Sequence, residues 1–185
     1  MIESPKNALV VSAHSADFVW RAGGAIALHA QQGYAVHIVC LSFGERGESA
    51  KLWRKGDMSE QKVKAARREE AQAAADILGA SVEFFDIGDY PMRADKETLF
   101  RLADVFRKVQ PEFVLSHSLK DPYNYDHPLA MNLTQEARII AQAEKIRPRV
   151  FDRFFRGDPS RVGPGSGLGL SIVAELAVAM GGRAF

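Results

Sequence analysis

The chain has 185 residues, of which 46% are hydrophobic and 25% are charged, as is typical of one globular domain. Its 24 Lys and Arg residues nearly balance 23 Asp and Glu residues, so the formal charge of +1 argues against an electrostatic nucleic-acid binder. The single cysteine, Cys40, excludes an internal disulfide, and the sequence lacks the run of about 18 apolar residues that a membrane span needs. We therefore expect a cytoplasmic protein with no nucleic-acid or membrane partner.

The first half of the chain alternates short apolar runs with helix-like stretches. Residues 8–13 form an apolar, β-branched run that predicts a strand, and a helical stretch follows over about 19–32. A second apolar run covers residues 35–42, and a long amphipathic segment over 59–78 follows a polar loop. Each helical stretch ends at a glycine, which is a common helix stop.

The same pattern continues through the next 65 residues or so, which we read with the same rules. It predicts strands over 81–87 and 112–117, and helices over 96–109 and 128–143. Four successive strand–helix units predict an α/β, Rossmann-like parallel sheet with helices on its faces. In such sheets ligands bind at the carboxyl ends of the strands, so the loops after the first and fourth strands are the places to search for a site.

These two loops carry residues that can bind a metal. His14 and Asp17 lie three residues apart after the first strand, and His127 lies in the loop after the fourth. Together they would offer three ligands and leave positions open for water or substrate, an arrangement that suits zinc or a similar divalent ion. The alternative for an isolated loop histidine is a capping or solvent-exposed role.

Three sequence patterns resemble the LmbE/PIG-L superfamily of zinc-dependent enzymes, best known as de-N-acetylases: His14-x-x-Asp17, Arg68-Glu69-Glu70, and Asp126-His127. The resemblance covers residues 1 to about 145 and implies that His14, Asp17 and His127 hold the zinc. The usual turn of this superfamily is His-Pro-Asp-Asp, and its first Asp is the general base. Here that position is Ala16, and general-base assistance is typically worth about 10²- to 10⁴-fold in rate.

Residues 14–24, 42–49 and 121–127 resemble one branch of that superfamily more closely, the 4-oxalomesaconate hydratases of gallate degradation. This resemblance implies addition of water to 4-oxalomesaconate, or to its enol 4-carboxy-2-hydroxymuconate, giving 4-carboxy-4-hydroxy-2-oxoadipate. A bound zinc would polarise an oxo or carboxylate oxygen, and a separate side chain must then move protons.

Candidate residues for the other roles come from the loops after the second and fourth strands. Glu48 is the first candidate for the acid/base, Glu45 is the second, and Asp126 is a candidate for orienting a ligand histidine. The candidates for binding a small polycarboxylate substrate are Arg46, Lys120, Arg21 and His117. The alternative for the charged loop residues is simple solvation, and a homo-oligomer is left open.

Two further histidines and the cysteine are interpreted as structural. His29 and His37 lie within a predicted helix and a predicted strand, with no carboxylate close to them in the sequence. Cys40 lies inside an apolar strand and is expected to be an inert buried thiol.

Residues 147–185 differ in composition, with seven of the 15 glycines and none of the five histidines. Residues 151–156 and 165–170 resemble the Phe-rich box and the second glycine box of a sensor histidine kinase ATP-binding domain, and a helix is expected over about 168–180. The sequence lacks that domain's adenine site, its Asn-bearing helix and the phosphoacceptor histidine. It therefore predicts two incomplete domains, a metal-dependent hydratase domain over 1–146 and a kinase-like ATP-lid fragment after it.

A hydro-lyase that is incomplete at its C-terminal end is the main interpretation. The alternatives are a zinc-dependent de-N-acetylase, an ATP-binding kinase fragment, and an inactive chimera. A de-N-acetylase would need a carboxylate in place of Ala16, and a kinase would need an Asn box that the sequence lacks.

Overall fold

The computed structural model describes residues 6–144. Its elements follow one another in this order: β1 (Asn7–Ser12), α1 (Asp17–Gln31), β2 (Ala35–Cys40), α2 (Ala50–Trp53), α3 (Glu60–Leu78), β3 (Ala80–Phe84), α4 (Lys96–Val109), β4 (Phe113–Leu115) and α5 (Asp126–Glu144). The four strands and four helices predicted before residue 144 are all present, with ends that differ by a few residues. The four-residue helix α2 was not predicted, because it is too short to show a helical period.

The chain divides into two units, residues 1–138 and 139–185. The second unit lies almost entirely outside the described residues. The same holds for the expected domain boundary after residue 146, for the glycine box and for the expected helix over 168–180.

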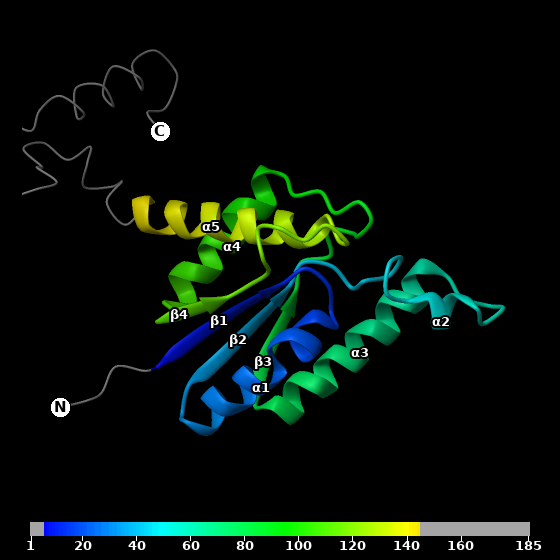
Figure 1. The fold of residues 1–185 in the computed structure, drawn as a ribbon, viewed down its shortest axis with the longest axis horizontal. Helices are drawn as coiled ribbons and strands as arrows, with labels where there is room; N and C mark the ends of the chain where they lie inside the picture. The colour runs from blue at the N-terminus through cyan, green and yellow to red at the C-terminus, as the bar shows by residue number, and fades with distance from the viewer. Residues whose placement is uncertain (1–5, 145–185) are drawn as a thin grey trace, which may run out of the picture. The chain divides into compact units, whose positions relative to one another are not determined.

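The four strands form a parallel sheet in the order β3-β2-β1-β4. The chain adds β2 and then β3 on one side of β1, and it returns to place β4 on the other side. Strand order therefore reverses between β1 and β4, and the crevice at their carboxyl ends is where open α/β sheets bind ligands. In Figure 1, α1 and α3 lie on one face of the sheet and α4 lies on the other. The expected fold class is confirmed.

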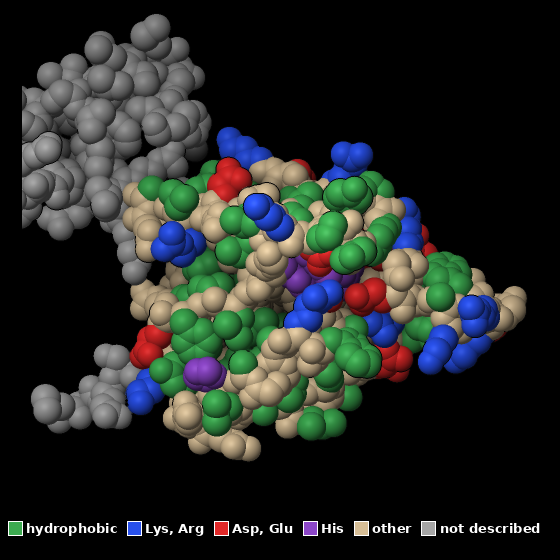
Figure 2. Space-filling view, in the orientation of Figure 1, with side chains coloured by type: hydrophobic (Ala, Val, Ile, Leu, Met, Phe, Trp, Pro, Cys, Tyr) green, Lys and Arg blue, Asp and Glu red, His purple; other side chains and the backbone are tan. Residues whose placement is uncertain are grey.

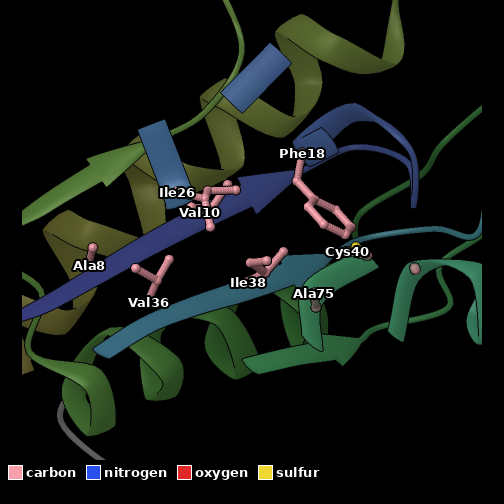
Figure 3. Close-up of a cluster of buried hydrophobic side chains, with 9 residues drawn as sticks. Ala8, Val10, Phe18, Ile26, Val36, Ile38, Cys40 and Ala75 are labelled. Carbon is pink, nitrogen blue, oxygen red and sulfur yellow. The ribbon is translucent and has the colours of Figure 1, made fainter. Parts of the chain in front are cut away.

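An apolar cluster fills the space between the sheet and the helices α1 and α3 (Figure 3). Its buried members are Ala8, Val10, Phe18, Ile26, Val36, Ile38, Cys40, Ala71 and Ala75. Ala71 and Ala75 are four residues apart and so share one face of α3, where their small side chains allow close approach to the sheet. The intervening strand residues Leu9, Val11 and Val39 are also buried, which explains why the strands read as continuous apolar runs.

Helix α3 has well-formed ends. The Ser59 hydroxyl accepts a hydrogen bond from the backbone N–H of Lys62, and Gly79 ends the helix with a φ of 72°, a left-handed conformation that favours glycine. Within residues 6–144, none of the helices combines the length and hydropathy that crossing a membrane requires.

Candidate metal centre and active site

The three predicted metal ligands meet at the carboxyl ends of β1 and β4. His14 follows β1, Asp17 begins α1, and His127 lies in the first turn of α5. One nitrogen or oxygen atom from each residue lies within 4.8 Å of the others, and all three residues are buried. Helix α5 begins two residues earlier than expected, so its first turn carries both Asp126 and His127. Figure 2 shows histidine side chains at the centre of one face of the molecule, next to acidic and basic side chains.

Asp17 is the centre of this cluster. Its Oδ2 atom lies 3.0 Å from His14 Nδ1 and 3.3 Å from His127 Nε2, and it accepts the backbone N–H of His14 at 3.0 Å. Burial alone would raise the pKa of Asp17, but the contacts with His127 and His14 outweigh burial and hold this pKa below its usual range. The carboxylate is therefore ionised and directed at both imidazoles.

His14 carries a proton in this charge environment. Burial alone would lower the pKa of His14, but Asp17, Glu48 and Asp126 together raise it to about 9. The side chain is fully buried, so the positive charge is balanced by these carboxylates rather than by water. The same negative charges would stabilise a divalent cation in place of that proton, because metal binding to histidine displaces protons.

The two ring nitrogens of His127 face different carboxylates, Nδ1 facing Asp121 and Nε2 facing Asp17. Its Nδ1 atom lies 2.7 Å from Asp121 Oδ2, whereas its Nε2 atom is buried without a hydrogen-bond partner among the described residues. A carboxylate at Nδ1 fixes the tautomer that leaves the lone pair of Nε2 for a metal. His127 Nε2 and Asp17 Oδ2, 3.3 Å apart and without a well-formed hydrogen bond between them, therefore fit a shared cation. Asp121 was missed in the sequence analysis, although it lies only six residues before His127.

Asp126 orients His14 from the opposite side. Its Oδ2 atom lies 3.2 Å from His14 Nε2, and its two oxygens accept the backbone N–H groups of Tyr90 and Met92 at 3.1 and 3.0 Å. With Nε2 held in this way, the Nδ1 atom of His14 faces Asp17. This contact is the one expected for a carboxylate that orients a ligand histidine.

Glu48 borders the three ligands. Its Oε1 atom lies 3.6 Å from His14 Nδ1, and its Oε2 atom lies 3.5 Å from a guanidinium nitrogen of Arg67. Burial and the nearby charge of Asp17 raise the pKa of the Glu48 carboxyl. Arg67 also donates to the backbone carbonyl of Phe43. The sequence analysis missed Arg67, because only the packing of α3 brings it to this loop.

Glu45 and Arg46 pair with α3 rather than with the ligands. Glu45 is 1% exposed, with one carboxylate oxygen 3.5 Å from Lys64 Nζ and the other without a hydrogen-bond partner among the described residues. Burial raises the pKa of the Glu45 carboxyl. Arg46 is exposed and lies 3.7 Å from Glu60. The described contacts of both candidates are therefore structural ion pairs.

His117 and Arg21 line a cavity of about 270 Å³ beside the ligands, together with Asp17 and Asp121. The Nε2 atom of His117 accepts the backbone N–H of Ala13 at 2.9 Å. Burial lowers the pKa of His117 to about 4, so the imidazole is neutral, and its lone pair is already used by this hydrogen bond.

The ring of His117 stacks on that of His127, with centroids 4.1 Å apart. Arg21 Nε lies 3.2 Å from Asp17 Oδ1, and Lys120 is exposed on the loop after β4. His117 thus packs against the candidate ligand His127, while Arg21 supplies positive charge at the cavity.

Comparison with known proteins gives three kinds of match. The family model PIG-L, described as GlcNAc-PI de-N-acetylase, matches residues 9–138. The chain is 87% identical over 143 residues to a 4-oxalmesaconate hydratase of Pseudomonas putida, a match that covers 77% of this chain and 55% of the relative. A stretch of 42 residues is 55% identical to a sensor histidine kinase component of Mycobacterium tuberculosis, covering 23% of this chain and 25% of that protein.

A solved structure agrees with the first two matches. The crystal structure of GalB, the 4-carboxy-2-hydroxymuconate hydratase from Pseudomonas putida KT2440, superposes with a TM-score of 0.75 at 77% sequence identity, covering 87% of this chain and 63% of that one. The chain therefore spans about half the length of the curated hydratase it matches. Since the family model covers well over half of the chain and includes all three candidate ligands, the chain belongs to the PIG-L family.

Proposed function

We propose that residues 1–146 form a metal-dependent hydratase domain of the 4-oxalomesaconate hydratase type, which adds water to a carbon–carbon double bond of a small polycarboxylate. The observation that carries this proposal is the position of Glu48, whose carboxylate lies 3.6 Å from His14 while residue 16 is alanine. The site thus has a proton-moving group on the loop after β2 and none at position 16. The 87% identity to a 4-oxalmesaconate hydratase supports the reaction class.

The proposed metal is zinc, held by His14, Asp17 and His127. Two imidazoles and one carboxylate are a donor set that zinc accepts, and the Nε2 atom of His127, which makes no hydrogen bond among the described residues, faces Asp17 as a ligand would. When bound, zinc supplies Lewis-acid chemistry that offsets negative charge on an oxo or carboxylate oxygen of the substrate.

The other side chains are proposed to move protons and hold substrate. Glu48 takes a proton from water and returns one to carbon. Its pKa is raised toward neutral pH, and proton transfer is most efficient when the pKa of the acid/base lies near the working pH. Arg67 holds one Glu48 oxygen, so the other faces His14. Arg21, beside the cavity, and Lys120 supply positive charge for the carboxylates of 4-oxalomesaconate or 4-carboxy-2-hydroxymuconate.

A zinc-dependent de-N-acetylase is the second candidate, favoured by the description of the family model. The methyl group of Ala16 cannot accept a proton, so amide hydrolysis would have to use Glu48 as its base. An Ala16→Asp variant separates the two reactions, because it restores the superfamily's His-x-Asp-Asp carboxylate. Release of acetate from an N-acetyl sugar that appears only in this variant supports the hydratase assignment, whereas release by the unaltered chain favours the de-N-acetylase.

Residues 147–185 are proposed to be a kinase-derived fragment without nucleotide function. A 42-residue match at 55% identity to a sensor histidine kinase component supports a kinase origin for part of the chain. Titration with ATP and Mg²⁺ tests this point. Saturable binding in the micromolar range, lost on changing Gly167 and Gly169, would contradict it.

The main test combines zinc analysis with a hydratase assay on the full chain. We expect one zinc per chain, loss of zinc in His14→Ala, and retention in His37→Ala, whose histidine contacts Ser81 and Glu83 instead. Glu48→Gln should keep its zinc and lower kcat by about 10²-fold or more. Full turnover in Glu48→Gln would remove Glu48 from the mechanism.

A further inference from the structure

We propose that Asp89 and Tyr90, on the loop after β3, are positioning residues that hold the Glu48 loop against the metal centre. The Glu48 loop is defined here as residues 43–49. The inference rests on the proposed role of Glu48, and it assigns a task to two side chains that neither move protons nor bind the metal.

Asp89 anchors the Glu48 loop through its backbone. The carboxylate is 1% exposed, and its oxygens accept the backbone N–H of Arg46 at 3.0 and 3.1 Å and that of Gly47 at 2.8 Å. These two amides immediately precede Glu48. A buried carboxylate that lost such partners would be left unsatisfied at considerable cost, so Asp89 strongly favours this one loop conformation.

Tyr90 fixes the same loop by shape. A Cβ atom at Gly47 would lie 2.1 Å from Cε2 of the Tyr90 ring, so the ring occupies the space that any larger residue would need. The backbone at Gly47 does not itself require glycine, because its φ lies outside the left-handed region. The Tyr90 ring also contacts the candidate metal centre, since it stacks on the His14 ring with centroids 5.8 Å apart and an angle of 19° between the ring planes.

Tyr90 is also hydrogen-bonded to the carboxylate that contacts His14 from the other side. The backbone N–H of Tyr90 donates to Asp126 Oδ2, which also lies 3.2 Å from His14 Nε2. One short segment therefore sets both the orientation of His14 and the position of the loop that carries Glu48. A displacement of about 1 Å between reacting groups can reduce the rate about 10²-fold, so this segment controls the separation that matters for proton transfer.

The first test exploits the tight contact at Gly47. Gly47→Ala forces a methyl group into the Tyr90 ring, and we expect kcat to fall about tenfold or more while KM and zinc content change little. Gly56→Ala is the matched control, because a Cβ there meets nothing within 4 Å. In the double variant Gly47→Ala/Tyr90→Ala the clash is gone, so its kcat should equal that of Tyr90→Ala alone. Effects that simply add would overturn the proposal.

The second test measures opening of the Glu48 loop by proteolysis and needs no activity assay. Arg46 is exposed, and trypsin can cleave after it only when the loop opens. We expect cleavage about tenfold or more faster in Asp89→Ala, an intermediate rate in Asp89→Asn, which keeps one carbonyl acceptor, and an unchanged rate in the exposed control Asp76→Ala.

The two results separate this inference from the proposed function. Faster cleavage in a chain that hydrates nothing supports the anchoring role and removes the hydratase assignment. Equal cleavage in Asp89→Ala and the unaltered chain overturns the anchoring role, even if the chain is an active hydratase. Zinc loss in Asp89→Asn that matches its loss of kcat would also overturn it, because Asp89 would then support the metal rather than Glu48.

Discussion

Two buried clusters share the same elements but are stabilised by different interactions. Apolar packing stabilises the cluster under α1 and α3, and specific charge contacts stabilise the polar cluster at the carboxyl ends of β1 and β4. Phe18 and Asp17 are neighbours at the start of α1, yet Phe18 enters the apolar cluster and Asp17 contacts two histidines. In the first cluster each group is satisfied by any apolar neighbour of the right shape. In the second each group depends on the charge of a particular partner. Changes in the first should alter stability, and changes in the second should alter what the site binds.

The largest expected effect is on stability and comes from the apolar side. Phe18→Ala removes a 1% exposed ring, and we expect a loss of about 3–5 kcal/mol in the free energy of unfolding. Urea denaturation of the metal-free chain measures it. Val19→Ala is the control, because Val19 is 41% exposed. If the folded fraction of Phe18→Ala also fails to take up zinc, the two clusters are not independent.

The next effect concerns the charge that the polar cluster shares. Asp17→Asn keeps the shape of the side chain but removes the negative charge beside His14 and His127. We expect zinc affinity to fall about 10²-fold or more, measured by competition with a chelator. An unchanged affinity would mean that the two histidines alone define the site.

A pH effect distinguishes the two clusters in the metal-free chain. The folded pKa of His14, about 9, lies above its unfolded value of 6.5, so its contribution to stability is fully present below pH 6.5 and is lost as pH rises toward 9. We expect the free energy of unfolding to decrease by an amount on the order of 1–3 kcal/mol across this range, as measured by urea denaturation at each pH. In His14→Gln the slope should decrease but not vanish, because contacts with Asp17 and Asp121 also raise the pKa of His127. A slope that does not decrease would assign the titration to another group.

The smallest effect tests the connection between α3 and the site. Arg67→Lys keeps the positive charge but loses the planar fork that reaches both Glu48 and the Phe43 carbonyl. We expect kcat to fall by less than the change in Glu48→Gln, about tenfold or below, with zinc content unchanged. A loss as large as that of Glu48→Gln would make Arg67 an equal partner in proton transfer.

Much of the fold and the three ligands could be predicted because they depend on local pattern. Strand and helix periods predict the alternating elements, and parallel strands place their following loops at one edge of the sheet. His14, Asp17 and His127 were therefore expected to converge. The contact of His37 with Glu83 at 2.9 Å was not, because it depends on the register that sets His37 opposite Ser81 and brings Glu83 to the same face.

The direction of loop side chains was equally inaccessible from the sequence. Glu45 and Glu48 are three residues apart in one polar loop, and both were candidates for the acid/base. The structure turns Glu45 toward Lys64 and Glu48 toward His14. The loop backbone between these two residues is held by contacts with Asp89 and Tyr90, which lie 40 or more residues further along the chain. No local pattern contains that information.

The single thiol can serve as a chemical probe of how often the sheet opens. Cys40 ends β2 within the apolar cluster, is 0% exposed, and has a pKa raised well above its ordinary value by burial. A thiol in that state is unreactive until the sheet opens, so its modification rate reports the opening equilibrium. Because the sequence has no second cysteine to react with the reagent, the rate of Cys40 labelling with and without a ligand would measure how much that ligand suppresses opening of the sheet.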